Sequence, residues 1–171
     1  MKTILIAFAG LILLNCQTHS ADKPYIPTTK LPDNFYFKIA YSHNETYDSR
    51  DSTYTRLYVS GDTVVKIPFP KDIILSVYNK ILENKFLDLP PDIPMDEKMP
   101  FTFPSSHDRI MVFIGGRTNK NLKISTGLSR GGTPLDTIQS KRFDNVYNII
   151  VKALTEIKEY KQLRPSDVFY L

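Results

Sequence analysis

Residues 109–114 read Arg-Ile-Met-Val-Phe-Ile, and every side chain after Arg109 is apolar. A short run that is apolar at consecutive positions is typical of a strand buried on both faces. Gly115-Gly116 ends the run, residues 118–121 are polar and form a turn, and residues 122–125 return as a hairpin partner. We therefore expect residues 109–114 to form the central strand of an antiparallel sheet.

Three extended stretches precede this strand. Apolar and other side chains alternate in residues 34–41, which predicts a strand with one buried face. Residues 54–59 and 63–67 predict two more strands, joined by a turn at Gly61-Asp62. Residues 42–52 are polar, and we expect them to form a loop.

Two segments have helical periodicity. Asp72 is the expected N-cap of the first helix, whose apolar residues recur at helical spacing as far as Leu82. Prolines 90 and 91 prevent this helix from continuing. The second helix is expected over residues 140–159, and its apolar stripe is Phe143, Val146, Tyr147, Ile150, Leu154 and Ile157.

These elements predict an α+β fold with the order strand, strand, an optional third strand, helix, strand, strand, helix. Because each helix has one apolar stripe, we expect an antiparallel sheet of four to five strands with two helices on one face. Residues 34–171 are expected to form this single domain, which is of ordinary domain size. Two long loops, residues 91–108 and 126–137, interrupt the pattern.

The amino terminus has the pattern of an export signal. Lys2 precedes an unbroken apolar run over residues 4–14, and the only cysteine of the chain, Cys16, follows closely. At 1.5 Å per residue this run covers roughly half of a ~30 Å hydrocarbon core, so it is too short to span a membrane. A charged start and a short apolar run are typical of a cleaved signal peptide.

Leu13-Leu14-Asn15-Cys16 resembles the lipobox of bacterial lipoproteins, although Asn15 stands where a smaller residue is usual. The chain as a whole resembles the small lipoproteins of diderm bacteria that have no assigned function. The resemblance implies that residues 1–15 are a signal peptide and that Cys16 carries acyl chains. It also implies that residues 16–33 form the lipidated amino terminus and a flexible tether. Gln17, where an Asp would favour inner-membrane retention, favours the outer membrane.

Ordinary secretion is the alternative. Thr18-His19-Ser20 has small residues at the two positions that signal peptidase recognises, so cleavage after Ser20 would release a freely soluble exported protein. In that case Cys16 would be lost with the signal.

Composition excludes several classes of function. The formal net charge of +4 is small, and the basic residues are spread along the chain, whereas nucleic-acid binding needs a dense basic face. The single cysteine excludes internal disulfides and thiolate zinc sites. The three histidines have no metal-ligand spacing, and no sequence motif indicates a cofactor.

Ser105-Ser106-His107-Asp108 is the one cluster that suggests catalysis. Catalytic triads draw their members from separate segments, so we interpret this cluster as a turn before the central strand. The catalytic alternative is a secreted or periplasmic hydrolase that uses His107 with a carboxylate from elsewhere in the chain.

Two segments are candidates for contact with a partner. The first is the polar loop with Tyr47 and Arg50. The second is a stretch with four apolar candidates: Met95, Met99, Phe101 and Phe103. We therefore expect a membrane-anchored envelope lipoprotein whose domain is a non-catalytic binding or scaffold module for an envelope protein or polymer. Inhibition of a partner enzyme, with residues 95–103 as the inserted wedge, is a further alternative.

Overall fold

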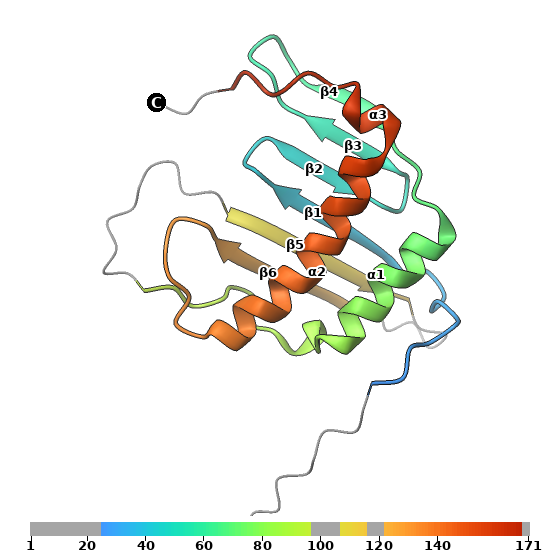
Figure 1. Cartoon of the computed structure of the whole chain (residues 1–171), viewed down its shortest axis with the longest axis vertical. Helices are drawn as coiled ribbons and strands as arrows, with labels where there is room; N and C mark the ends of the chain where they lie inside the picture. The colour runs from blue at the N-terminus through green and yellow to red at the C-terminus, as the bar shows by residue number, and fades with distance from the viewer. Residues whose placement is uncertain (1–24, 97–106, 116–121, 169–171) are drawn as a thin grey trace, which may run out of the picture.

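The computed structural model describes residues 25–96, 107–115 and 122–168 of the chain (Figure 1). A six-stranded antiparallel sheet with the order β4-β3-β2-β1-β5-β6 forms one layer. This confirms the α+β prediction, with one or two strands more than expected. The strands are β1 (Tyr36–Tyr41), β2 (Glu45–Asp48), β3 (Thr53–Arg56), β4 (Thr63–Lys66), β5 (His107–Ile114) and β6 (Leu122–Ser129).

The additional strand, β2, lies inside the segment that we expected to be a polar loop. Ser42 and His43 both have positive φ, at 54° and 58°, which turns the chain tightly after β1. Residues with positive φ at two successive positions match the twist of a hairpin. The prediction of a loop over residues 42–52 is therefore wrong, because a hairpin turn followed by only four strand residues leaves little periodicity to detect.

Strand β5 is an interior strand between β1 and β6. It begins at His107, so His107 and Asp108 belong to a strand and the predicted turn at this position is wrong. Asp108 is only 2% exposed and accepts a hydrogen bond from the Ser42 backbone N–H at 3.2 Å. Strand β6 likewise runs past residue 125 to Ser129, through the start of the expected loop.

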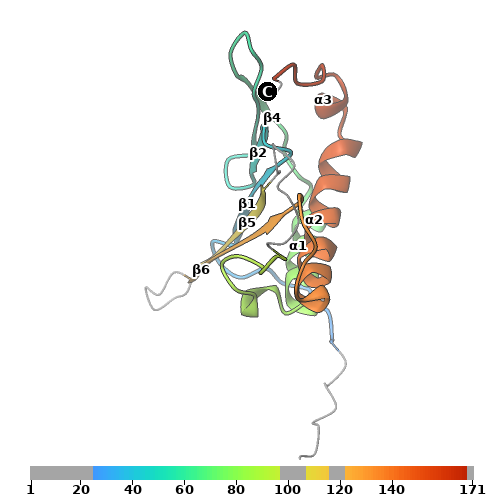
Figure 2. The same ribbon diagram turned by 90° about the vertical axis from the view of Figure 1, so that its left-hand side faces the viewer.

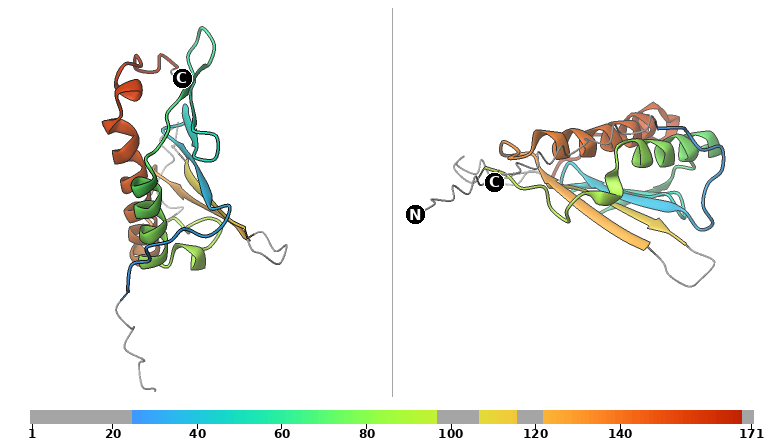
Figure 3. Two further views of the ribbon diagram at one scale, coloured as in Figure 1. Left: turned by 90° about the vertical axis from the view of Figure 1, so that its right-hand side faces the viewer. Right: turned by 90° about the horizontal axis from the view of Figure 1, so that it is seen from below.

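Two long helices cover one face of the sheet, as predicted (Figures 2 and 3). Helix α1 is Lys71–Glu83 and has Pro70 in the cap position, so Asp72 lies in the first turn and is not the N-cap. Helix α2 is Thr137–Glu156, and its N-cap Asp136 accepts hydrogen bonds from two backbone N–H groups. A short helix α3 (Lys158–Lys161) follows, and a single 3-10 turn η1 (Phe86–Asp88) follows α1.

The core lies between the helices and the sheet. Alternate strand residues and the helical stripes meet there, and Phe37, Ile110 and Phe143 are all fully buried. Fully burying one such side chain contributes about 1.5–3 kcal/mol. Three ring pairs of the core, Phe37–Tyr47, Tyr41–Tyr147 and Phe86–Phe143, pack edge to face or tilted, which suits their ring quadrupoles.

Residues 25–33, which we expected to be part of a flexible tether, lie against α1. The Asn79 side chain accepts hydrogen bonds from Tyr25 Oη at 2.5 Å and from the Thr28 N–H at 2.9 Å. Its amide nitrogen donates back to the Thr28 carbonyl at 3.0 Å. The prediction that residues 16–33 form a flexible tether is therefore wrong for residues 25–33, because Tyr25 and Thr28 are hydrogen-bonded to α1. Residues 16–24 lie outside the described residues.

The second face of the sheet points away from the helices. In Figure 3 both long helices lie on the same side, and no described helix covers the other side. Among the described residues, none of the helices combines the length and the hydropathy that a membrane crossing requires.

Candidate functional site

The structure separates the residues that we predicted to contact a partner. Cys16, Met99, Phe101 and Phe103 lie outside the described residues. Tyr47 is 1% exposed, and its hydroxyl donates to the Ile67 carbonyl at 3.0 Å. Tyr47 is therefore a core residue, and its prediction as a contact residue is wrong.

Met95 is half-buried and packs against the core. Met95 forms an isolated antiparallel β-bridge with Pro134. The N–H of the next residue, Asp96, donates to the Thr133 carbonyl at 2.8 Å. These bonds hold the start of the long loop against the segment that leads into α2. Met95 is thus mainly a packing residue in the described structure.

Arg50 is exposed and forms one end of a row of side chains on the open face of the sheet. Its guanidinium carbon lies 5.1 Å from the centroid of the Tyr36 ring. Tyr36 stacks on Phe113 with 4.3 Å between the ring centroids and 6° between the planes. Lys123 Nζ lies 5.7 Å from the Phe113 centroid. We call these four residues the cation–aromatic row.

The strand register explains why the row forms. Tyr36 is paired with Phe113 across β1 and β5, and Phe113 is paired with Lys123 across β5 and β6. Asp48 of β2 is paired with Lys38 of β1. Arg50 comes two residues after Asp48 and Tyr36 two residues before Lys38, so the antiparallel register places Arg50 beside Tyr36. Directly opposed residues of neighbouring strands have their side chains on the same face of the sheet. Each cation–π contact at an exposed site stabilises the folded protein by about 0.5–1 kcal/mol.

A cleft of about 740 Å³ opens at this end of the sheet. The row contributes all four of its members to the lining, and Phe35, Ile74 and Ile114 add apolar walls. Gly115 is needed for the shape of this end, because a Cβ there would lie 2.7 Å from the Cβ of Asn34. The cleft therefore combines apolar walls with two cations.

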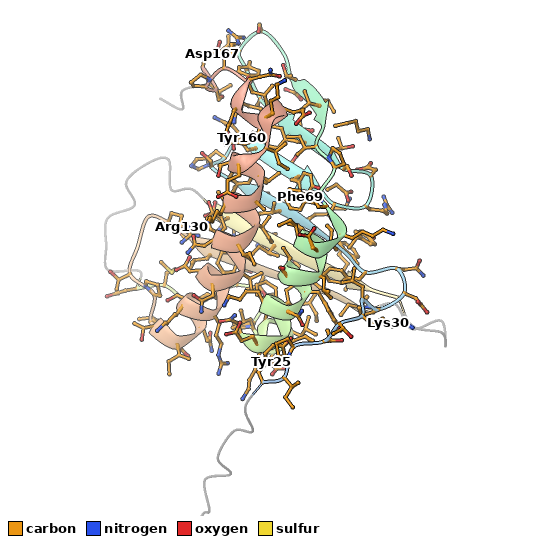
Figure 4. All side chains as sticks on the ribbon, turned by 45° about the vertical axis from the view of Figure 1, so that its right-hand side comes forward. Tyr25, Lys30, Phe69, Arg130, Tyr160 and Asp167 are labelled. Carbon is orange, nitrogen blue, oxygen red and sulfur yellow. The ribbon has the colours of Figure 1, made fainter. Side chains whose placement is uncertain are left out.

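A second cleft, of about 510 Å³, lies where the C-terminal segment crosses the sheet. Arg56 and Glu45 line it and form an ion pair, with Arg56 Nε 2.9 Å from Glu45 Oε1. Tyr160, labelled in Figure 4, donates to Glu45 Oε2 at 3.3 Å. Arg56 also donates to the Tyr54 hydroxyl and to the Arg164 carbonyl, at 2.9 and 2.7 Å. The hydrogen bonds and the ion pair of Arg56 and Glu45 are thus all made with other groups of the protein.

Burial perturbs the titration of this region. Burial raises the pKa of Tyr41 and of Tyr54 well above the ordinary range, and the Glu45 carboxylate raises both further. Burial lowers the pKa of Arg56, but Glu45 and Tyr54 raise it by more, so that its guanidinium stays charged. Perturbed groups beside a cleft are typical of functional sites, and they are equally typical of internal ion-pair networks. Because the ion pair is saturated by protein groups, we interpret it as structural.

His107 lies in an exposed cluster with Asp92 and Arg109. Its Nε2 is 3.4 Å from Asp92 Oδ1 and 3.1 Å from Arg109 Nη2, and Arg109 is 2.6 Å from the same carboxylate oxygen. The expected carboxylate from elsewhere in the chain is therefore present. A nucleophile must lie within about 3 Å of its base. No hydroxyl or thiol of the described residues bonds to His107, and none of the three clefts found in this part of the chain is lined by it.

The cluster has a clear structural role. The loop before it pairs with β6 through two backbone bonds, from Gly127 N–H to the Pro91 carbonyl and from Ile93 N–H to the Gly127 carbonyl, each 2.9 Å. Arg109 and Asp92 lie over Gly127, where a Cβ would overlap both side chains. The cluster thus holds the loop to the edge of the sheet.

Asp108, the neighbour of His107 in the sequence, faces the helices instead. Arg130 pairs with Asp108 and with Asp144 of α2, and its guanidinium lies 4.6 Å from the Tyr147 centroid (Figure 4). This network ties β5 and the end of β6 to α2. His107 and Asp108 therefore face opposite sides of β5, and Ser105 and Ser106 lie outside the described residues.

No family model matches the chain, and a search of curated proteins finds no similar sequence. The described residues contain no group of three or more metal-ligating side chains. Sequence reasoning identified Arg50 and missed Tyr36, Phe113 and Lys123. Alternation in residues 34–41 places Tyr36 on the face opposite Phe37, but residues 109–114 are apolar at consecutive positions and were expected to be buried on both faces. Only the structure shows that Phe113 lies on the open face beside Tyr36.

Proposed function

We propose that the protein is an exported lipoprotein of the cell envelope, anchored through acylated Cys16, whose domain is a non-catalytic binding or scaffold module. The pattern of residues 2–16 supports the anchor. The proposed location is the outer membrane, as Gln17 favours, and the proposed partner is an envelope protein or polymer.

One observation carries the binding role: the sheet has one face covered by helices and one face that no described helix covers. The open face holds the cation–aromatic row, with Arg50 and Lys123 both exposed, and the row lines one side of a cleft whose other side includes Ile74 of α1. A charged and aromatic surface without a base–nucleophile pair favours recognition over catalysis.

The anchor and the fold together limit how far the domain stands from the lipid. Residues 16–24 are nine residues long, so at up to about 3.6 Å each they reach ~30 Å. Tyr25 lies at the opposite end of the described domain from Asp167 (Figure 4). In the proposed arrangement the Tyr25 end faces the membrane and the C-terminal end faces outward. One acyl chain binds marginally and two or more bind stably, so a diacylglyceryl cysteine would suffice.

Labelling with a fatty-acid analogue in the native host tests the anchor. We expect the full-length chain to incorporate label and Cys16→Ala to incorporate none. Ser20→Arg, which blocks the alternative cleavage position, serves as the control and should label like the wild type. A mature chain that begins at Ala21 and carries no acyl group, detected by mass spectrometry, would contradict the proposal.

In-cell crosslinking tests the binding role. The tagged chain, crosslinked in the intact envelope and purified under denaturing conditions, should recover a protein or polymer above the level of an unrelated lipoprotein bait. Recovery of nothing above this background would count against a binding or scaffold module.

A further inference from the structure

We propose that the cleft between Arg50 and Lys123 binds an elongated anionic molecule with an apolar middle part. The inference rests on the proposed binding role, which it makes specific, and it does not depend on lipid at Cys16.

The charges that line the cleft have one sign. Arg50 and Lys123 are its two cations, and no carboxylate is among its described lining residues. The nearest carboxylate along β2, Asp48, pairs with Lys38 at 2.6 Å. Low-dielectric walls and charges of one sign focus the field toward the cleft, so an anion is favoured there.

The spacing of the two cations sets the length of the ligand. The row crosses from the β2 side through β1 and β5 to β6, which is three intervals between strands. Neighbouring strands lie about 4.8 Å apart, so the two ends of the row are separated by about 14 Å. A molecule with anionic groups at about this separation can pair with both cations together.

The surface between the cations is apolar. Tyr36 and Phe113 stack face to face and carry a cation on each outer face, so their ring edges point outward between the charges. Phe35, Ile74 and Ile114 line the same cleft from the helix-covered side of the sheet, where they pack against the core. The cleft volume of about 740 Å³ lies in the range of small-molecule sites, about 300–1,000 Å³.

The probe for the test is the dianionic aromatic dye bis-anilinonaphthalene sulfonate, titrated by fluorescence against the full chain carrying Cys16→Ala. Arg50→Gln and Lys123→Gln should each weaken binding about fivefold, as expected for loss of one exposed ion pair. The double variant should weaken it further, and added salt should weaken binding to the parent protein. Lys141→Gln, which removes an exposed charge from α2, is the matched control and should bind like the parent.

Neither cation takes part in the core, so each single variant should still unfold cooperatively and lose no more stability than one exposed cation–π contact contributes. Equal affinity in the parent and the double variant would overturn the inference. Equal binding of the neutral analogue N-phenyl-1-naphthylamine would do the same. A vesicle-binding measurement distinguishes a membrane surface from a small molecule. The inference would be overturned if phosphatidylglycerol vesicles, but not phosphatidylcholine vesicles, retained the protein through Arg50 and Lys123 and the dye did not compete. Failure of the labelling or crosslinking experiments would reject the proposed function and leave the dye result unchanged.

Discussion

Arg56 and Glu45 are direct partners across β3 and β2, and their side chains are only 5% and 12% exposed. The pair stands on the covered face of the sheet, where the remaining strand residues are mainly apolar. Arg56 also bonds to the Arg164 carbonyl, so one buried cation joins two strands to the C-terminal segment.

Breaking this pair should destabilise the fold strongly. Arg56→Met leaves the Glu45 carboxylate buried without a cation, and removal of one partner of a buried pair costs about 3–5 kcal/mol. The double variant Arg56→Met, Glu45→Leu should lose clearly less than the single variant, because no uncompensated charge remains. Urea unfolding at pH 7 measures both. Lys152→Met, an exposed charge on α2, is the control and should change the unfolding free energy by at most about 0.5 kcal/mol.

Tyr41 and Tyr47 should respond in opposite ways to loss of the hydroxyl. Tyr41 is 4% exposed, and none of the described groups is in hydrogen-bonding geometry with its hydroxyl. Tyr41→Phe removes an unsatisfied buried group and should stabilise the protein by about 1 kcal/mol. Tyr47→Phe removes the bond to the Ile67 carbonyl and should destabilise it by about 1 kcal/mol. Equal effects of the two variants in thermal unfolding would contradict this assignment.

The protein should lose stability in alkaline solution. Burial raises the pKa of Tyr147 to about 12, from an ordinary value of 10.0, and raises the pKa of Tyr41 and Tyr54 as well. Above pH 10 the unfolded chain releases these protons while the folded chain retains them, so unfolding becomes more favourable. The stabilisation is complete below pH 10 and declines as the pH rises toward 12. Denaturant midpoints at pH 8, 9, 10 and 11 measure the decline, which should be shallower in Tyr41→Phe.

Gly127→Ala should displace the loop that pairs with β6. The added methyl group would overlap His107 Nε2 and lie 2.7 Å from Asp92 Oδ1 and 2.8 Å from Arg109 Nη2. All three side-chain ends must therefore move, and their contacts over Gly127 are lost. Gly132→Ala is the matched control, since its methyl group would meet only the flexible end of Met95, at 3.3 Å. Hydrogen exchange at Ile93, whose N–H bonds to the Gly127 carbonyl, should accelerate in Gly127→Ala alone. Unchanged exchange at Ile93 would show that the loop is held by other contacts.

Local periodicity was sufficient for most of the elements. The alternation of Phe37, Ile39 and Tyr41 predicted the buried face of β1, and all three are buried. The helical stripes predicted α1 and α2 on one face because an amphipathic helix has to bury one side. Strand β2 was missed because four residues between two turns carry almost no period, and Tyr47 was consequently assigned to the surface.

The candidate sites depend on contacts between distant segments. Asp92 and His107 are fifteen positions apart in the sequence, and Arg56 and Arg164 are far more distant, so no local pattern indicates either contact. Arg50 was identified because it lies in a polar stretch of the sequence. Its aromatic neighbours Tyr36 and Phe113 could be identified only from the pairing of β1 with β5.

The sequence by itself determined the α+β class, the burial pattern of the long elements and the prediction of an anchor at Cys16, because each follows from the spacing of apolar and special residues along the chain. Only the tertiary structure decided that Tyr36, Phe113, Arg50 and Lys123 form one row and that Tyr47 is internal. The reason is that strand register is set by the packing of the whole buried face, and a shift by one residue would exchange the two faces of a strand.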